Sequence, residues 1–323
     1  MTMRRALLLA GLLLTSVLAH AQPTDYPQKA VKIVVPYAPG GLDILYRAIA
    51  AELAIKWRQP VIVENRPGAD SIIGADSVAK AAPDGYTLLA TGDFTIIANR
   101  FLYSKLPYDP DKSFVPVSLV AQTDMFIVAS ETLPVKDLRE LVAYARAHPK
   151  KVSYGSFSRG SAPDLAFEIL NKREGLDLLG VPYKGVSPIM AAIAGGEIQL
   201  GMGGTNVAAP LVLAKKMKVL AMSGPTRHHQ FPDVATATEQ GFPYLDSRFW
   251  YGVFAPAGTP GPIVEKISKD IQAILANKTF TELNLTARGI RAMSGRSDDL
   301  AKKIPEDAAR AAQAFREAGI KPE

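Results

Sequence analysis

Short apolar runs that fit β-strands alternate with longer amphipathic segments that fit α-helices along most of the chain. This alternation is typical of α/β proteins with mainly parallel sheets. The pattern predicts strands at 31–35, 61–64, 86–90, 115–120, 126–129, 152–156, 178–182, 198–202, 219–222 and 251–255, and helices at 44–57, 73–81, 135–147, 164–171, 188–194 and 263–277.

The length of the chain predicts two domains, because a single hydrophobic core seldom grows beyond about 250–300 residues. No repeat of fixed period and no low-complexity linker separates them. Residues 122–124 lie between two long apolar strands, so we expect extended strands to cross between the domains. We place one domain at 22–123 plus 247–323 and the other at 124–246, with a cleft between them that can hinge.

The first 21 residues have the pattern of a cleaved secretory signal peptide. Arg4 and Arg5 precede an apolar run that ends at Leu18, and the small residues Ala19 and Ala21 mark a cleavage site before Gln22. The whole chain has 37 basic and 31 acidic residues, so removal of the two leader arginines lowers its formal charge from +6 to +4. We expect an exported protein in the periplasm.

Composition and motifs exclude several classes of function. The chain has no cysteine, which excludes disulfides, thiolate metal sites and cysteine nucleophiles. His148 and the pair His228 and His229 lack metal-ligand spacing, and the sequence has no nucleophile elbow, Walker loop or complete dinucleotide-binding motif. Basic residues are scattered among acids, which argues against nucleic-acid binding. We therefore expect no catalytic residue, no metal and no cofactor.

The most informative segment is the turn that follows the first predicted strand. Val35 is followed by Pro36 and Pro39, then by Gly40 and Gly41, and a helix begins. Glycine lets the backbone approach a ligand, and the first N–H groups of a helix have no partner inside the helix. The turn therefore suits an anion, although an ordinary strand-to-helix connection is the alternative interpretation.

Glycine and polar residues follow four other predicted strands, around positions 92–95, 155–161, 182–185 and 203–206. Ligands of open α/β sheets bind at the carboxyl ends of strands, so loops from both domains predict a clamshell site. The candidate ligand-binding residues are Tyr37, Pro39, Gly40, Gly41, Asp43, Asp93, Thr95, Ser156, Arg159, Gly160, Ser161, Tyr183, Gly185 and Thr205. Arg159 can meet a ligand carboxylate in a bidentate pair or point into solvent.

These residues belong to a longer set of motifs by which the chain resembles the tripartite tricarboxylate transporter substrate-binding proteins, also called Bug proteins. The resemblance spans residues 26–319. The motifs that carry it are VPYAPGG at 35–41 with Asp43 and Arg47, VENRPGA at 63–69, IGA at 73–75, PDGYTLL at 83–89, LPYDP at 106–110, VPYKG at 181–185 and YGVFAPAGTP at 251–260.

The resemblance implies a periplasmic binding protein fold of the type II-like clamshell class, with crossing strands and a ligand cleft between its domains. It implies a monomeric, non-catalytic receptor that closes on a small mono- or dicarboxylate and delivers it to the membrane permease subunits of a tripartite tricarboxylate transporter. It also implies that backbone N–H groups and water hold the carboxylate. The sequence departs from the family at Leu42, the single residue between Gly41 and Asp43, and at Asp70 and Ser71, which replace a commoner glycine pair.

Two other functions stay open at this point. A secreted α/β hydrolase or lyase would need an acid–base pair, and Asp43, Asp93 and Tyr183 have no obvious partner in the sequence. A receptor that passes its closed form to a signalling protein would use the same two domains.

Overall fold

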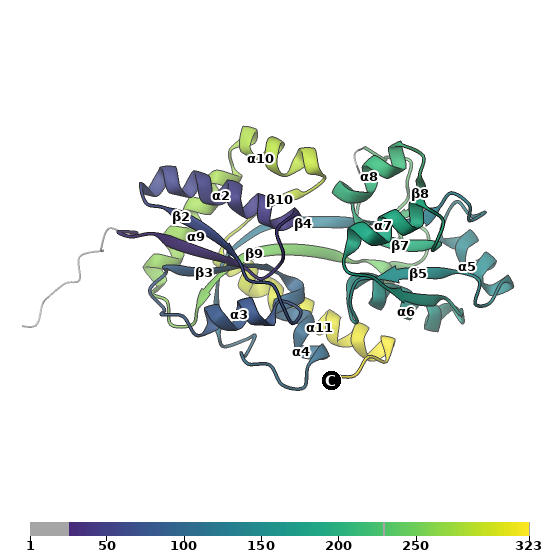
Figure 1. The fold of residues 1–323 in the computed structure, drawn as a ribbon, viewed down its shortest axis with the longest axis horizontal. Coiled ribbons are helices and arrows are strands. Elements are labelled where there is room, and N and C mark those ends of the chain that lie inside the picture. The colour runs from purple at the N-terminus through teal and green to yellow at the C-terminus, as the bar shows by residue number, and fades with distance from the viewer. Residues whose placement is uncertain (1–25, 229, 323) are drawn as a thin grey trace, which may run out of the picture.

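The structure, a computed structural model, describes residues 26–228 and 230–322 and contains two lobes joined by long strands (Figure 1). The predicted leader at 1–21 lies outside the described residues. Within the described part, none of the helices has the length and apolar character needed to cross a bilayer.

The first lobe is built on a mixed sheet. Its parallel part consists of β1 (Val31–Val35), β2 (Val61–Asn65) and β3 (Thr87–Gly92), with β1 in the middle. β9 (Arg248–Pro256) pairs antiparallel with β3, β4 (Phe114–Ser130) pairs antiparallel with β9, and β10 (Arg291–Gly295) pairs antiparallel with β4.

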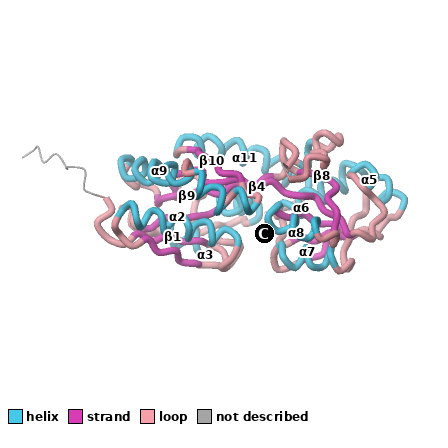
Figure 2. Tube along the Cα trace, turned by 90° about the horizontal axis from the view of Figure 1, so that it is seen from above, coloured by secondary structure: helices cyan, strands magenta, loops and turns pink. Residues whose placement is uncertain are grey.

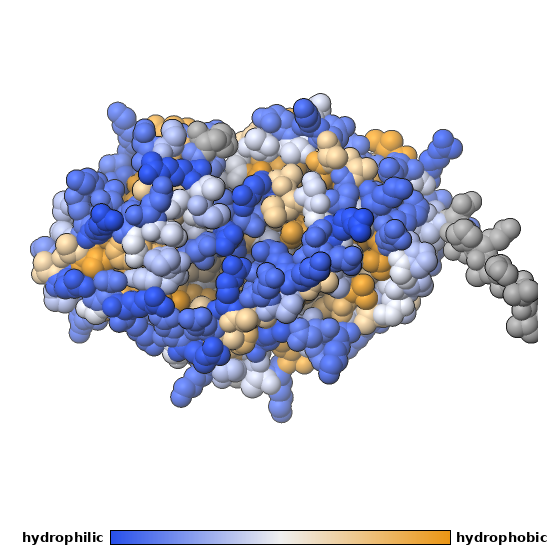
Figure 3. Space-filling model, turned by 180° about the vertical axis from the view of Figure 1, so that it is seen from behind, coloured by the Kyte–Doolittle hydropathy of each residue, from blue (hydrophilic) through white to orange (hydrophobic). Residues whose placement is uncertain are grey.

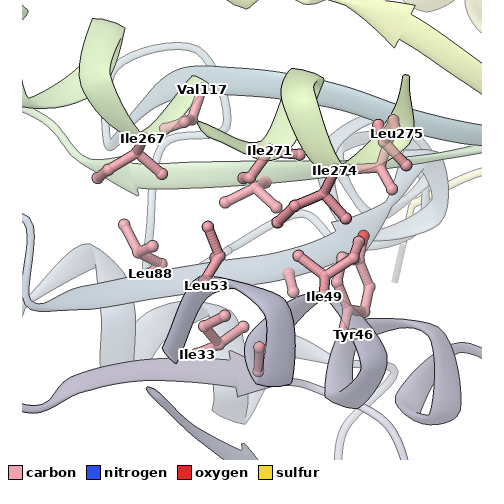
Figure 4. Close-up of a cluster of buried hydrophobic side chains, with 14 of the residues drawn as sticks. Ile33, Tyr46, Ile49, Leu53, Leu88, Val117, Ile267, Ile271, Ile274 and Leu275 are labelled. Carbon is pink, nitrogen blue, oxygen red and sulfur yellow. The ribbon is translucent and has the colours of Figure 1, made fainter. Parts of the chain in front are cut away.

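Helices cover both faces of this sheet. One face packs against α2 (Gly41–Trp57) and α9 (Gly261–Leu275), where buried side chains such as Ile33, Ile49 and Ile271 interlock (Figure 4), and α10 (Lys278–Asn284) extends this core. The other face packs against α3 (Ile72–Ala79), the π-helix η1 (Phe94–Ala98), α4 (Asn99–Leu102) and α11 (Ser297–Ala318).

The second lobe has the same layered design. Its sheet contains the parallel strands β5 (Ser153–Ser156), β6 (Leu179–Pro182) and β7 (Leu200–Gly204), and β4 lies antiparallel between β7 and β8 (Met217–Met222). α5 (Leu138–Ala147) and α6 (Ala162–Glu174) cover one face, and α7 (Val186–Ala194) and α8 (Thr205–Leu213) cover the other. Two 3₁₀ turns, η2 (Pro243–Leu245) and η3 (Thr286–Arg288), complete the described elements.

β4 connects the lobes because its two halves pair in different sheets. Asp124 is the last β4 residue paired with β9, opposite Arg248, and Met125 is the first paired with β7, opposite Gly204. The chain therefore crosses where residues 122–124 predicted a crossing. The division at 123/124 and 246/247 stays a prediction, which the change of pairing supports. Figure 2 shows the strands passing through the middle of the molecule and the carboxyl end between the lobes.

Two expectations from the sequence were wrong. The sheets are mixed rather than mainly parallel, because β4 and β9 are antiparallel to their neighbours. The predicted strands at 115–120 and 126–129 form one continuous strand.

We predict that Gly160→Ala lowers the free energy of unfolding more than Gly175→Ala does. Both glycines have a left-handed backbone, with φ of +69° and +62°, so each substitution costs about 1–2 kcal/mol for the backbone alone. An added Cβ at Gly160 would lie 2.6 Å from Leu102 and 2.7 Å from Phe315, both buried, whereas Gly175 faces open space. The extra crowding at Gly160 should add about 1–3 kcal/mol.

Urea unfolding followed by circular dichroism measures both variants, and Gly175→Ala serves as the control for the backbone cost. Equal losses in the two variants would show that the contact between Gly160 and the first lobe is loose enough to accept a methyl group.

Candidate functional site

The turn between β1 and α2 has open space where a side chain of its glycine would project. Gly40 is the N-cap of α2 with φ of +139°, a conformation that side chains rarely adopt. No side chain of the N-cap accepts a bond from the first helical turn, and nothing lies within 4 Å of the position that a Cβ of Gly40 would take. Pro39 and Gly40 are exposed and Gly41 begins the helix. This arrangement agrees with the anion-binding turn predicted from the sequence.

Three helices of the second lobe begin in the same way, directly after a strand. α6 follows β5 with Ser161 as its N-cap, α7 follows β6 with Gly185, and α8 follows β7 with Gly204. None of these N-cap side chains bonds to its helix, and Gly185 has φ of +109° with open space around it. In Figure 1, α7 and α8 lie on the side of the second lobe that faces the first. Each of these helices thus begins with N–H groups that have no partner inside the helix and with the positive end of its dipole.

A closed ring of three hydroxyl groups supports the β1–α2 turn. The Tyr37 hydroxyl lies 3.0 Å from Thr91 Oγ1 and 2.8 Å from Thr95 Oγ1, and the two threonine oxygens are 2.6 Å apart. Both threonines are fully buried. Burial raises the pKa of Tyr37 although the two threonines oppose the shift, so the phenol stays neutral and its proton stays within the ring.

The ring continues to a strained turn before α3. Thr95 donates to Ser71 Oγ at 2.7 Å, and the buried Asn99 donates to the Asp70 carbonyl at 2.9 Å. Ala69, Asp70 and Ser71 have φ of +44°, +49° and +73°, which is unfavourable for residues with side chains. Strained backbone persists where its surroundings fix it, and these bonds supply that constraint.

Asp43 lies in the first turn of α2 and forms an ion pair with Arg47 of the same helix. Its buried carboxylate accepts a bond from Arg47 Nε at 2.9 Å, and Arg47 also donates to Asn65 Oδ1 at 2.8 Å. Asn65 in turn donates to the Tyr37 carbonyl at 3.1 Å. Burial opposes ionisation, but the bonds with Arg47 and Asn65 prevail and lower the pKa of Asp43. In this structure Asp43 positions the turn through an ion pair.

The candidate residues of the second lobe separate into buried and accessible groups. Ser156 and Ser161 are buried with their hydroxyl oxygens 3.2 Å apart, and Thr205 is buried and donates to the Gly289 carbonyl of the first lobe at 2.8 Å. Tyr183 is half-buried, and its N–H donates to the Ser156 carbonyl at 2.7 Å. Arg159 is exposed.

Gly160 packs against the first lobe, at the Leu102 and Phe315 side chains, and its N–H donates to Asp164 Oδ2 at 2.8 Å. The β5–α6 loop therefore contributes both to the junction and to the contact between the lobes.

The structure separates Asp93 from Thr95, although the sequence placed them in one loop of the site. They flank Phe94 in the π-helical turn η1, so Thr95 joins the hydroxyl ring while Asp93 lines a different pocket, between α6 and α11. Asp93 Oδ1 is buried and has no hydrogen-bond partner among the described residues. Burial, with a smaller contribution from the charge of Asp307, raises the pKa of Asp93 to about 8.

Several residues of the site had not been found from the sequence. Thr91, a partner of Tyr37, lies inside a strand, and Ser71, which accepts a bond from Thr95, stood out only as a departure from the family's glycine pair, so no pattern assigned either to the hydroxyl groups of the site. α8 was also missed, because Pro210 inside it reads as a helix breaker. Gly204 and Thr205, at the start of α8, were the signal in the sequence that could have indicated this helix.

Among the described residues, no group of three or more His, Asp or Glu side chains is placed to hold a metal ion. The site that remains consists of backbone N–H groups, hydroxyl groups and one exposed guanidinium.

Comparison with known proteins identifies the family. A family model described as the tripartite tricarboxylate transporter family receptor matches residues 45–320. The chain belongs to this family. The resemblance noted from the sequence is therefore confirmed, and so is the fold of a two-lobed periplasmic binding protein.

Relatives of this receptor cover nearly its whole length. It is 30% identical to the protein BugT of Bordetella pertussis over 99% of each chain, and 35% identical to a protein encoded in the tcbD-tcbE intergenic region of Pseudomonas sp. strain P51, over 92% of this chain and 89% of the other.

Solved structures agree with the fold. A Rhodopseudomonas palustris protein with adipate is 31% identical with a TM-score of 0.83, covering 92% of the receptor and 100% of that chain. MatC of Rhodopseudomonas palustris with bound malate is 33% identical with a TM-score of 0.78, covering 90% and 99%. The periplasmic binding protein BugD is 32% identical with a TM-score of 0.80, covering 92% and 100%.

We predict that Asp93→Asn stabilises the receptor at alkaline pH. The carboxyl of the unfolded chain ionises at about pH 3.9, whereas burial raises the pKa of Asp93 in the folded protein to about 8. Between these values the folded protein binds the extra proton, so its stability falls as the pH rises. Asparagine does not ionise, so the difference in free energy of unfolding in favour of Asp93→Asn should grow as the pH rises. It should reach roughly 1–3 kcal/mol, the cost of an unpaired buried polar group.

Melting temperatures of both proteins at pH 5, 7 and 9 test this prediction. Asp177→Asn, at an exposed position outside the pocket, is the control. An advantage of Asp93→Asn that is the same at all three pH values would contradict the raised pKa.

Proposed function

We propose that the protein is a periplasmic receptor that binds a small organic carboxylate between its lobes and delivers it to the permease of a tripartite tricarboxylate transporter. The observation that carries this proposal is the set of four helix N-termini from both lobes, at α2, α6, α7 and α8, none of which is capped by its own N-cap side chain. Such N-termini are suited to carboxylate groups.

The open space around Gly40 and Gly185 supports the same site. Each glycine precedes a helix, one in each lobe, and neither has an atom within 4 Å of the place where a side chain would begin. A carboxylate between them would accept bonds from backbone N–H groups, which need no side-chain ordering. Hydroxyl groups and water complete the shell, as the resemblance to the family implies.

The ligands of relatives support the choice of a carboxylate. One relative was solved with adipate and another with malate, and both molecules are dicarboxylates. We extend only this chemical class to the receptor. Export through the predicted leader at 1–21, a monomeric state and transfer to permease subunits belong to the same proposal.

We predict that a panel of mono- and dicarboxylates contains at least one ligand that raises the melting temperature and binds with one site per chain in calorimetry. A ligand that binds only the folded state must stabilise it. Gly40→Val should remove this binding, because the branched side chain would fill the open space before the first N–H groups of α2.

Gly196→Val is the matched control, since Gly196 also has a positive φ, of +78°, and open space around it but lies outside the candidate loops. Circular dichroism establishes that both variants are folded. If folded protein binds no acid of the panel, the carboxylate proposal fails. If Gly40→Val binds as well as the unsubstituted protein, the site lies elsewhere.

We predict that Arg159→Ala weakens binding of a dicarboxylate about ten-fold or more while scarcely changing affinity for a monocarboxylate of the same length. The exposed guanidinium of Arg159 belongs to the β5–α6 loop and can pair with the far carboxylate of a ligand held by the N-termini. A ten-fold change corresponds to about 1.4 kcal/mol.

Calorimetry with the matched acids gives both affinities, and Arg159→Lys tests whether charge alone suffices. Equal losses for both acids would assign Arg159 to the near carboxylate or to loop structure, and no loss for either would leave it as a solvated side chain.

A further inference from the structure

A second pocket of about 420 Å³ lies at the junction of the lobes, between α6 and α11. The π-helical turn η1 and the start of β9 complete its wall, so both lobes contribute. It shares only Asp93 and Gly160 with the candidate ligand residues. Figure 3 shows the back of the molecule, where a hydrophilic surface surrounds smaller hydrophobic patches.

Most charged side chains of this pocket already have partners. Arg173 of α6 makes two contacts with Glu317 of α11, one of them from Nη2 to Oε2 at 2.9 Å. Arg248 pairs with Asp246 at 2.6 Å. Asp307 accepts a bond from Trp250 Nε1 at 2.8 Å and also pairs with two cations, Lys303 at 3.2 Å and Arg310. These groups need no ligand.

Asp93 is the exception among the acids of the wall. Its Oδ1 is buried without a hydrogen-bond partner among the described residues, and Asp307 and Lys303 are the charged groups that act on it. A buried carboxyl oxygen without a donor is unfavourable, so a donor from outside the chain would stabilise it.

The turn that carries Asp93 is a π-helix, the rarest of the helical forms and one that often occurs at functional sites. Its wide turn places Thr95 in the hydroxyl ring and leaves Asp93, Phe94 and Ile97 on the wall of the second pocket.

Apart from these ion-paired groups and a few polar side chains, the wall carries an apolar part that can hold the body of a ligand. Side chains from η1, α6, β9 and α11 provide it, namely Phe94, Ile97, Leu165, Ile169, Phe249 and Phe315. A pocket of this size fits a small molecule.

We propose that this pocket is a second binding site, for a small primary amine with an apolar body, whose ammonium group pairs with Asp93 and whose body packs against the side chains of α6 and α11. The proposal requires the Asp93 carboxyl, which lines the pocket, to turn an oxygen toward the ammonium group. The charge of this ligand is opposite to that of the carboxylate proposed to bind at the helix N-termini (the front site), so the two sites are separable by experiment.

The test uses cyclohexylmethylamine, with cyclohexylmethanol and cyclohexanecarboxylate as probes of similar size but different charge. Calorimetry on the full-length mature protein at pH 9, above the pKa of Asp93 and below that of the amine, should give binding of the amine at least ten-fold tighter than of either control probe. Asp93→Asn should remove that preference, and Asp177→Asn should retain it.

A second pair of variants locates the ligand without altering Asp93. Ala314→Trp, on the α11 wall, should fill the pocket and abolish amine binding, whereas Ala309→Trp, exposed on the same helix, should not. Binding of the carboxylate identified for the front site should persist in Ala314→Trp, so failure of one site is distinguishable from failure of the other. If the amine binds no better than the alcohol, or if Asp93→Asn or Ala314→Trp binds it unchanged, the proposal is wrong.

Discussion

The pairing of β4 with partners in both lobes is the constraint on which the rest of the structure depends. Its first part pairs with β9 and β10, its second with β7 and β8, and most of its 17 residues are buried or half-buried. Because hydrogen bonds hold each half in a separate sheet, a movement of one lobe relative to the other would have to bend or twist β4 near Asp124 and Met125, where the pairing changes.

This connection explains why the candidate site is built from backbone. In the proposed site, parallel strands of each lobe end and the next helices begin, so backbone N–H groups would hold the ligand without any long side chain being ordered. Ordering a flexible lysine or arginine costs up to about 2 kcal/mol of side-chain entropy, whereas Gly40 and Gly185 are fixed by their helices. The hydroxyl ring at Tyr37 and the ion pair of Asp43 with Arg47 then hold the β1–α2 turn from behind.

The sequence predicted most strands, most long helices and the glycine turns, because these depend on local periodicity and on backbone conformations that few residues tolerate. It did not predict the mixed pairing of β4 and β9, since strand direction depends on partners far away in the chain. The placement of Asp93 and Thr95 shows the same limit: two positions separated by one residue reach different environments, because the π-turn between β3 and α4 depends on packing that no local pattern records. Thr205, a predicted ligand contact, donates its hydroxyl to the Gly289 carbonyl of the other lobe in this structure, and no local pattern indicates that bond.

The contact between α6 and α11 joins the two lobes, so a movement that closes the glycine turns on a ligand would act on this contact too. The Arg173–Glu317 ion pair is partly exposed, and such pairs contribute at most about 1 kcal/mol. Phe315 is 3% exposed and packs against Gly160 of the second lobe, where a buried aromatic side chain contributes about 1.5–3 kcal/mol. The apolar contact therefore contributes more than the ion pair to holding the two lobes together on this side. The second pocket is walled by both helices, so its apolar lining belongs to the same contact between the lobes that Phe315 and Gly160 make.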